Sequence, residues 1–267
     1  MIVIRECAGF DELEACVQLQ IETWGYDPND VVPRKTFLIA QKIGGQVIGA
    51  FDTNIPSATP FASNSAQELL VGFAFSLPGV KTGRNEPKAY LHSHMLAVKE
   101  QYRNRGIGTQ LKLEQRREAL SRGIRLMEWT FDPLEIKNAF INIHRLGAAV
   151  CCYREDFYGL SSSRLQGGLP TDRLLAEWRL DSPRVQAIIE GRPAVGHVIE
   201  ERILVPASIY EWKASEENRE RALAVQLENR LKFHKAFSQG LAVLDFSLDA
   251  EGNGVFELGP PTWTELN

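Results

Sequence analysis

A short glycine-bearing segment near the middle of the chain could bind phosphate. It reads Arg103-Asn104-Arg105-Gly106-Ile107-Gly108 and stands between an apolar alternating run, residues 91–98, and a run whose composition is typical of a helix. The first backbone N–H groups of a helix lack intrahelical acceptors, and glycine lets a ligand approach them closely. Two arginines add positive charge beside these amides. The segment therefore predicts a site for phosphate oxygens at the start of a helix.

The glycine spacing excludes two other nucleotide-binding motifs. A P-loop requires G-x-x-x-x-G-K-[ST], and this segment does not contain it. A dinucleotide fold requires G-x-G-x-x-G, and residues 109–111 supply no third glycine. Taken alone, the six residues have an alternative interpretation, which is a glycine-containing turn at the start of a helix that binds no ligand.

Two histidines in the preceding run could move a proton. His92 and His94 are two residues apart, so an extended backbone places both imidazoles on one face of a strand. Imidazole has an ordinary pKa near neutrality, which suits a general base. The alternatives are buried structural histidines bonded to carbonyl groups, or two ligands of a metal ion. A metal ion would need further ligands, and no nearby His/Cys cluster supplies them, so we expect no metal.

The surrounding sequence predicts a mixed succession of strands and helices. Strands are expected at 2–5, 46–52, 69–76, 89–98, 125–131 and 148–153, with helices at 11–24, 33–38, 109–124 and 134–146. Residues 54–67 and 78–87, which contain prolines, are expected to be loops. This order indicates an α/β or α+β sheet with helices on its faces.

The loop and the element order resemble the GCN5-related N-acetyltransferases (GNAT). Arg103-x-x-Gly106-x-Gly108 after a strand ending Leu-Ala-Val resembles the family signature (Gln/Arg)-x-x-Gly-x-(Gly/Ala). The resemblance implies a mixed, mostly antiparallel sheet flanked by helices, an N-acyltransferase activity, and acetyl-CoA or another acyl-CoA as co-substrate. In the family, this loop and helix start hold the coenzyme A pyrophosphate. The cofactor-binding residues implied here are Leu96, Val98, Arg103, Asn104, Arg105, Gly106, Ile107, Gly108 and Thr109.

The strand with the histidines is also similar to that of one family branch. His92-x-His94-x-Leu-Ala-Val resembles the arylalkylamine N-acetyltransferases, in which two histidines are linked to deprotonation of the amine. The resemblance implies His94 and His92 as catalytic bases, with a backbone N–H near Leu96 polarising the carbonyl group. Glu128 is an alternative base, and an ordinary exposed or salt-bridged carboxylate is the other interpretation of that residue.

A second family element is matched in part. Asn138, near the start of the 134–146 helix, is implied as a hydrogen-bond partner of the pantetheine arm, the alternative being a solvent-facing residue. The family's tyrosine, which protonates the departing thiolate, is replaced by Ile143. Tyr153 or Tyr158 could take that role or could be aromatic residues at the edge of the core, so the acid is unassigned.

Residues 160–267 extend beyond the usual family length and are expected to fold. Strands are predicted near 170–178 and at 201–210, a helix at 215–240 and a hairpin at 241–258. We therefore expect a GNAT-like acyl-CoA-binding domain at 1–159 and a C-terminal α/β extension at 160–267. The order within 215–248 loosely echoes that of 134–153, so the extension could be a degenerate second half-module.

The extension also resembles a larger branch of the superfamily. In that branch Trp-Thr-Phe-Asp-Pro-Leu, a helical Asn-Ala and a later Thr-Asp-Arg recur, and the last stands here as residues 171–173. Arg173 could bind a substrate carboxylate with both guanidinium nitrogens. A structural ion pair with Asp172 or another acid is the alternative.

Composition argues against several other classes of protein. The chain has 267 residues, 44% of them apolar, enough for a full core. A net charge of −4 argues against a general nucleic-acid binder. Four cysteines without metal-type spacing suit a reducing compartment, and the charged first residues lack the apolar core of a signal peptide or membrane span.

These observations lead to one expected function and two rivals. We expect a cytoplasmic enzyme that binds coenzyme A and a small-molecule amine or amino acid, with no nucleic acid or membrane partner and with a homodimer left open. A non-catalytic module that has kept the coenzyme pocket is the first rival. A protein N-acetyltransferase is the second.

Overall fold

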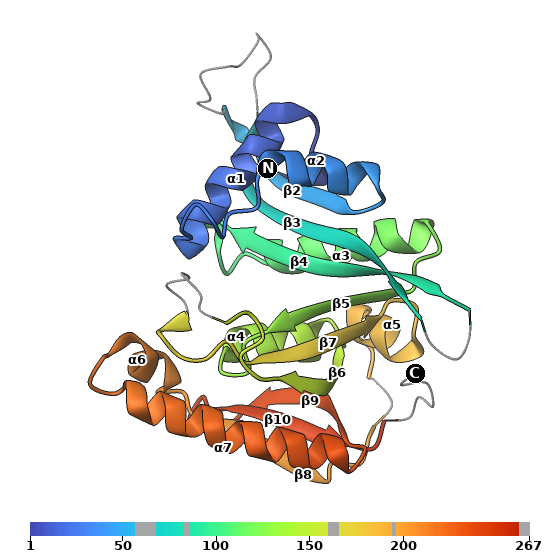
Figure 1. Cartoon of the computed structure of the whole chain (residues 1–267). Helices are drawn as coiled ribbons and strands as arrows, with labels where there is room; N and C mark the ends of the chain where they lie inside the picture. The colour runs from blue at the N-terminus through green and yellow to red at the C-terminus, as the bar shows by residue number, and fades with distance from the viewer. Residues whose placement is uncertain (57–67, 83–85, 160–165, 194–195, 262–267) are drawn as a thin grey trace. The chain divides into compact units, whose positions relative to one another are not determined.

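The computed structural model describes residues 1–56, 68–82, 86–159, 166–193 and 196–261, which fall into two compact units (Figure 1). The first unit comprises residues 1–127, and the second comprises the described residues from 128 onward. The units divide inside strand β5 (Leu126–Phe131). The predicted division between residues 159 and 160 rests on family length and stays a prediction.

The first unit is an antiparallel sheet with helices on both faces. Its strands are paired in the order β1-β2-β3-β4, each antiparallel to the next. In chain order its elements are β1 (Ile2–Glu6), α1 (Gly9–Trp24), α2 (Arg34–Lys42), β2 (Gln46–Pro56), β3 (Glu68–Lys81), β4 (Lys88–Val98), the short helix η1 (Glu100–Tyr102) and α3 (Ile107–Ser121).

Both faces of this sheet are apolar, and this explains the helices on either side. Phe73 and Phe75 of β3 pack with α2, where the ring of Phe37 meets that of Phe75 edge-on with 4.8 Å between centroids. Ala74, which lies between them, belongs instead to the cluster that contains Leu111 of α3. Successive residues of a strand point to opposite faces, so a continuous apolar run needs a helix on each.

Strand β3 is longer than the sequence indicates. Residues 78–81 were expected in a loop, but β3 continues to Lys81, and Pro78 lies opposite Leu91 of β4. A proline removes one backbone donor from a strand and does not prevent its carbonyl group or its neighbours from pairing.

The second unit contains the remaining strands in the order β5-β7-β6-β9-β10-β8. The β6–β7, β6–β9, β9–β10 and β8–β10 pairs are antiparallel. After β5 its elements are α4 (Ile136–Ala139), the π-helical turn η2 (Phe140–Arg145), β6 (Ala149–Arg154), β7 (Arg173–Arg179), α5 (Pro183–Ile189), β8 (Glu201–Val205), α6 (Ile209–Ala214), α7 (Arg219–Ser238), β9 (Ala242–Leu248) and β10 (Gly254–Gly259).

Helix α7 covers one face of these strands (Figure 1). Phe233 of α7 stacks on Tyr153 of β6 and meets Phe256 of β10 edge-on. The predicted helix and hairpin of the extension are thus confirmed as α7, β9 and β10. The strand predicted at 201–210 is wrong in its second half, because β8 ends at Val205 before Pro206 and α6 follows.

The helix predicted at 134–146 is present but irregular. It runs as α4 and then widens into η2, where the N–H of Leu146 donates to the carbonyl of Ile141, five residues earlier. Gly147 follows with a positive φ of 75°. Among the described residues, no helix is both long and apolar enough to cross a membrane.

Candidate functional site

The start of α3 offers backbone N–H groups to a ligand. Gly106 precedes the helix in the left-handed region, with φ 77°, and no side chain caps this end. The first turn carries no acidic residue, and a Cβ at Gly106 would meet no atom within 4 Å. A helix start with open amides and no neighbouring carboxylate attracts anions. The residues present therefore fit the phosphate site predicted from the sequence.

The loop before α3 is fixed to the rest of the unit. Arg103 Nε donates a hydrogen bond of 3.1 Å to the carbonyl of Val98, at the end of β4. The hydroxyl of Tyr102 donates to Asp52 Oδ2 at 2.9 Å, and the guanidinium of Arg105 lies 5.1 Å from the centre of the Tyr102 ring. Both arginines are exposed. Their positive charge is thus held beside the open helix start.

Strand β4, which carries the two histidines, contains a β-bulge. Phe75 of β3 lies opposite Met95, and Ser76 lies opposite Ser93, so His94 is an extra residue in β4. A bulge interrupts the ladder of hydrogen bonds and turns side chains locally. The imidazoles of His92 and His94 are nevertheless close, with 6.1 Å between ring centroids.

Both histidines hold their protons weakly. The pKa of His92 is lowered to about 4, mainly by burial and in smaller part by the neighbouring His94 and Lys112. His94 is more exposed, and partial burial lowers its pKa as well. Both imidazoles are therefore neutral at pH 7 and can accept a proton. Of the two, the more exposed His94 is the stronger candidate base, because a pKa as low as that of His92 makes a weak proton acceptor.

A buried lysine beneath the histidine strand was missed by the sequence analysis. Lys112 of α3 is 5% exposed, and its Nζ donates a hydrogen bond of 2.7 Å to Ser93 Oγ. Ser93 Oγ donates in turn to Gln115 Oε1 at 3.1 Å. Burial places the pKa of Lys112 well below its usual value. The sequence held one signal for this burial. Lys112 follows the apolar Leu111 and shares a helix face with residues 115 and 119, which are also buried.

The predicted cofactor residues of β4 pack against the start of α3. Leu96 and Val98 pack with the apolar cluster that contains Ile107. A Cβ on Gly108 would lie 3.4 Å from Leu96 Cδ2, so strand and helix approach closely here. The first unit thus brings together His92, His94, Leu96, Val98 and the residues from Arg103 to Thr109.

Three other predicted site residues belong to the second unit. Glu128 is 4% exposed, so it is not an exposed carboxylate, and its interpretation as a salt-bridged carboxylate stays a prediction. Asn138 is exposed on α4. Arg173 donates to the carbonyl of Asp172 at 2.8 Å and to Gln166 Oε1 at 3.1 Å. The roles predicted for these three residues stay predictions.

The two candidate acids, Tyr153 and Tyr158, differ in burial and in the hydrogen bonds of their hydroxyl groups. The hydroxyl of Tyr153 is buried and donates to Asp172 Oδ2 at 2.6 Å, and burial raises its pKa. Tyr158 is exposed, with its hydroxyl 2.9 Å from Thr130 Oγ1. Ile143, at the family's tyrosine position, is fully buried. Tyr158 is therefore the more available of the two proton donors.

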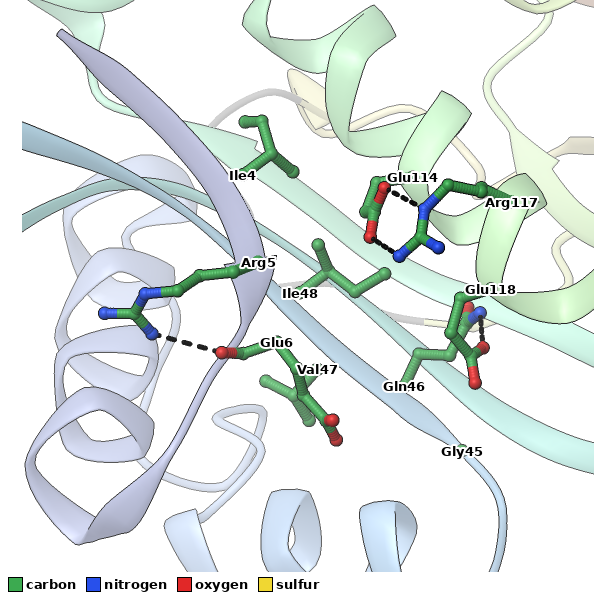
Figure 2. Close-up of a pocket in the computed structure, with 10 residues that line it drawn as sticks. All are labelled: Ile4, Arg5, Glu6, Gly45, Gln46, Val47, Ile48, Glu114, Arg117 and Glu118. Carbon is green, nitrogen blue, oxygen red and sulfur yellow. Dashed lines mark hydrogen bonds and ion pairs between the residues drawn. The ribbon is translucent and has the colours of Figure 1, made fainter. Parts of the chain in front are cut away.

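A cavity of about 270 Å³ lies in the first unit between β1, β2 and α3 (Figure 2). Its charged groups are paired, since Arg117 donates to Glu114 and Gln46 donates to Glu118. None of the predicted site residues lines it. This cavity is therefore separate from the predicted phosphate-binding loop.

The matched family supplies the decisive comparison. Residues 19–147 match the sequence model of the Acetyltransferase (GNAT) family. The chain carries a GNAT acetyltransferase domain. The matched stretch contains β4, the loop before α3 and α3 itself, so the family resemblance inferred from Arg103, Gly106 and Gly108 is confirmed. No curated protein sequence matches the chain.

Solved structures agree with this fold. NAA60 of Arabidopsis thaliana, solved with acetyl-CoA, has 17% identity and a TM-score of 0.50, over 67% of this chain and 99% of that one. The ribosomal-protein-S18-alanine N-acetyltransferase of Escherichia coli has 14% identity and a TM-score of 0.47, over 68% and 96%. An aminoglycoside 6′-acetyltransferase of type Ii has 17% identity and a TM-score of 0.48, over 67% and 98%. The likeness to NAA60, at a TM-score of 0.50 and 17% identity, shows the fold alone. The expected mixed, mostly antiparallel sheet flanked by helices is confirmed.

Proposed function

We propose that this GNAT acetyltransferase moves an acyl group from coenzyme A to the amine of a small molecule, with amino acids among the candidate acceptors. The observation that carries the proposal is the open start of α3 beside Arg103 and Arg105. This helix start follows β4, the strand that carries the histidines, with only the short helix η1 between them. The arrangement offers a phosphate site and a proton acceptor within one compact unit. The proposed cytoplasmic location rests on the sequence alone, and a homodimer is left open.

The chain's own groups divide the chemistry between them. The amides of Ile107, Gly108 and Thr109, with Arg103 and Arg105, would hold the pyrophosphate, and acyl-CoA supplies the activated thioester. His94 would accept the proton that the amine loses as its nitrogen attacks the carbonyl carbon, and the coenzyme would leave as its thiolate when the C–S bond breaks. A backbone N–H near Leu96 would hydrogen-bond the carbonyl oxygen as negative charge develops on it.

The acyl group and the acceptor are separate questions. The phosphate site binds the nucleotide end of the coenzyme and is indifferent to the acyl end, so succinyl or other acyl groups are candidates beside acetyl. If Arg173 binds a carboxylate, an amino acid or another carboxylate-bearing amine would be the preferred acceptor.

The first experiment is a thermal unfolding series with free CoA, acetyl-CoA, succinyl-CoA, ATP and NAD. A ligand at 100 times its Kd adds about 2.7 kcal/mol of stability, a rise of roughly 5–10 °C for a domain of this size. We expect a rise with the coenzyme A forms alone, largest for the preferred acyl donor. Thiol release in the presence of a panel of amines and amino acids then identifies the acceptor. No rise with any coenzyme A form at millimolar concentration contradicts the proposal.

A non-catalytic coenzyme A-binding module is the second candidate. It is favoured by Ile143 at the family's tyrosine position and by the engagement of Tyr153 with Asp172. Coenzyme A binding without thiol release for any amine supports this candidate. Modification of a protein with no small-molecule turnover would instead support a protein N-acetyltransferase.

A further inference from the structure

We propose that His197, Asp245 and Glu257 form a binding site for a divalent transition-metal ion in the second unit. One ligand atom from each residue lies within 4.8 Å of the other two. The three residues line a cavity of about 520 Å³ with residues of η2 and α5. The site is independent of the phosphate-binding loop and of the proposed acyl transfer.

The two carboxylates are brought together by the pairing of strands. Asp245 of β9 lies directly opposite Glu257 of β10, so both side chains point to the same face of the sheet. The neighbouring pair, Phe246 and Phe256, points to the other face, where Phe256 meets Phe233 of α7. Like charges directly opposite each other in a strand pair are destabilising. A cation between Asp245 and Glu257 would remove that repulsion.

The histidine provides a separate indication of a ligand. The Nε2 atom of His197 is buried and, within the described part of the chain, has no hydrogen-bond partner. A buried polar atom that bonds to nothing costs free energy, so such an atom calls for an explanation. Coordination of a metal ion by an imidazole nitrogen of His197 supplies one.

The segment that carries His197 is held against the same sheet. The N–H of Glu200 donates to the carbonyl of Leu258 at 2.8 Å, and a Cβ on Gly259 would overlap the carbonyl oxygen of Val198. These two contacts fix the backbone just after His197 beside β10. A metal ion would therefore join the segment before β8 to strands β9 and β10.

A second histidine supports one of the ligands. His144 Nδ1 lies 3.2 Å from Asp245 Oδ1, and the N–H of Phe246 donates to the same oxygen at 2.8 Å. Carboxylates that bind metals are usually oriented by hydrogen bonds of this kind. His144 is thus a positioning residue for Asp245.

Arginines also lie around the cavity, and one of them, Arg184, interacts electrostatically with Asp245. Arg184 donates to the carbonyl of Leu244, Arg192 pairs with Glu190, and Arg145 lies over the ring of Phe140. Arg202 Nε is 3.4 Å from Glu257 Oε1, a long contact that a metal ion would displace.

The donor set indicates the class of metal. One imidazole nitrogen and two carboxylate oxygens suit zinc or a neighbouring divalent transition metal better than magnesium or calcium, which prefer all-oxygen sites. Around tetrahedral zinc the ligand atoms are roughly 3–4 Å apart, so the three side chains need only small movements. Three protein ligands would leave a fourth position for water.

The test uses the tag-free full-length protein after removal of metals by a chelator. Titration with Zn²⁺ is followed by calorimetry, and titration with Co²⁺ is followed by visible absorption, which reports on the coordination geometry. We expect one ion per chain. His197→Gln and Asp245→Asn should each weaken binding at least about 10-fold, and His144→Gln should weaken it about 10–100-fold. His234→Gln is the matched control, because His234 is exposed on α7 and pairs with Glu155.

Folding of each variant is checked by its thermal midpoint without metal. Asp245→Asn removes one of two facing charges without changing shape, so it provides the test even if His197→Gln does not fold. Absence of Zn²⁺ binding by the unmodified chain at about 0.1 mM would overturn the proposal. Binding that persists in both ligand variants would also overturn it, since the ion would then lie elsewhere.

Discussion

The ammonium group of Lys112 lies 2.7 Å from the hydroxyl of Ser93, and both residues are buried. This hydrogen bond joins α3, which begins at the proposed phosphate-binding loop, to β4, which carries the two histidines. The two parts of the proposed site are thus linked through the interior of the first unit. Burial strongly disfavours the charged form of Lys112 at this position and holds its pKa well below the usual value.

Replacing Lys112 should stabilise the protein in a pH-dependent way. Burial lowers the folded-state pKa below the unfolded value, so over the interval between them the unfolded chain holds more protons. The free energy of unfolding therefore rises with pH up to about 10.4, the ordinary pKa of lysine. We expect Lys112→Met to be more stable than the unmodified chain at pH 7 and the difference to shrink toward pH 10. Urea unfolding between pH 6 and 10 measures it.

The matched control for that measurement is Lys42→Met, since Lys42 is an exposed lysine at the end of α2. Its unfolding free energy should differ little from that of the unmodified chain at every pH. Parallel pH curves for the Lys112→Met variant and the unmodified chain would show that the buried position does not disfavour the charge.

The histidines predict the acid side of the pH profile for acyl transfer. Because the pKa of His94 is lowered by burial, the imidazole stays neutral below its usual value near 6.5, and activity should persist into mildly acidic solution. His94→Ala should lower kcat/KM about 10²–10⁴-fold, the range for loss of a general base. The measurement is kcat/KM from pH 5 to 9, with His234→Ala as control. Unchanged profiles for both His94→Ala and His92→Ala would rule out a histidine base.

Local patterns in the sequence predict much of the first unit. The glycine and arginine spacing at 103–108 predicts an open helix start because that geometry depends on neighbouring residues alone. The two histidines are predicted on one face of a strand, and the structure places both in β4 with their ring centroids 6.1 Å apart. The bulge at His94 could not be predicted, since it arises from the register of β3 against β4.

Long-range contacts account for what the sequence did not indicate. Lys112 and Ser93 are 19 residues apart, and only the packing of helix on strand makes them partners. Asp245 and His197 are farther apart still and meet through the strand order of the second unit. A lysine, a histidine or an aspartate has no distinguishing local pattern at these positions, so burial and pairing decide its role.

A negative charge added at the start of α3 should weaken coenzyme A binding without lowering the stability of the protein. Gly108→Glu adds a carboxylate in the first turn, where it should be neutral or stabilising by about 0.3–1 kcal/mol because the helix dipole favours negative charge there. The same carboxylate would repel phosphate and occupy the space beside the open amides. We expect the Kd for CoA to rise at least about 10-fold with no fall in the thermal midpoint. Calorimetry and thermal unfolding provide the two readouts.

Gln110→Glu is the matched control for that charge, because Gln110 is exposed one turn into the same helix. It should weaken CoA binding by a smaller factor. Equal effects of the two substitutions would indicate a general electrostatic contribution, and unchanged binding by Gly108→Glu would place the phosphate elsewhere.

The side chain of Asp172 in the second unit depends on Arg230. Asp172 is fully buried, and Arg230 of α7 binds it bidentately, with Nε donating to Oδ2 at 2.9 Å and Nη2 donating to Oδ1 at 3.0 Å. The hydroxyl of Tyr153 also donates to Oδ2. The aspartate of the Thr-Asp-Arg motif thus ties α7 to β6.

Arg230→Met should leave this carboxylate buried without its cation, at a cost of about 3–5 kcal/mol in unfolding free energy. Arg230→Lys should recover only part of the loss, because an ammonium group cannot form the two parallel hydrogen bonds. Lys232→Met is the control, since Lys232 forms an exposed pair with Glu228 and its loss should change stability by less than about 1 kcal/mol. The measurement is urea unfolding at pH 7. A loss below about 1 kcal/mol for Arg230→Met would mean that Tyr153 and the backbone N–H of Asp156, 3.0 Å from Oδ1, suffice to hold the charge.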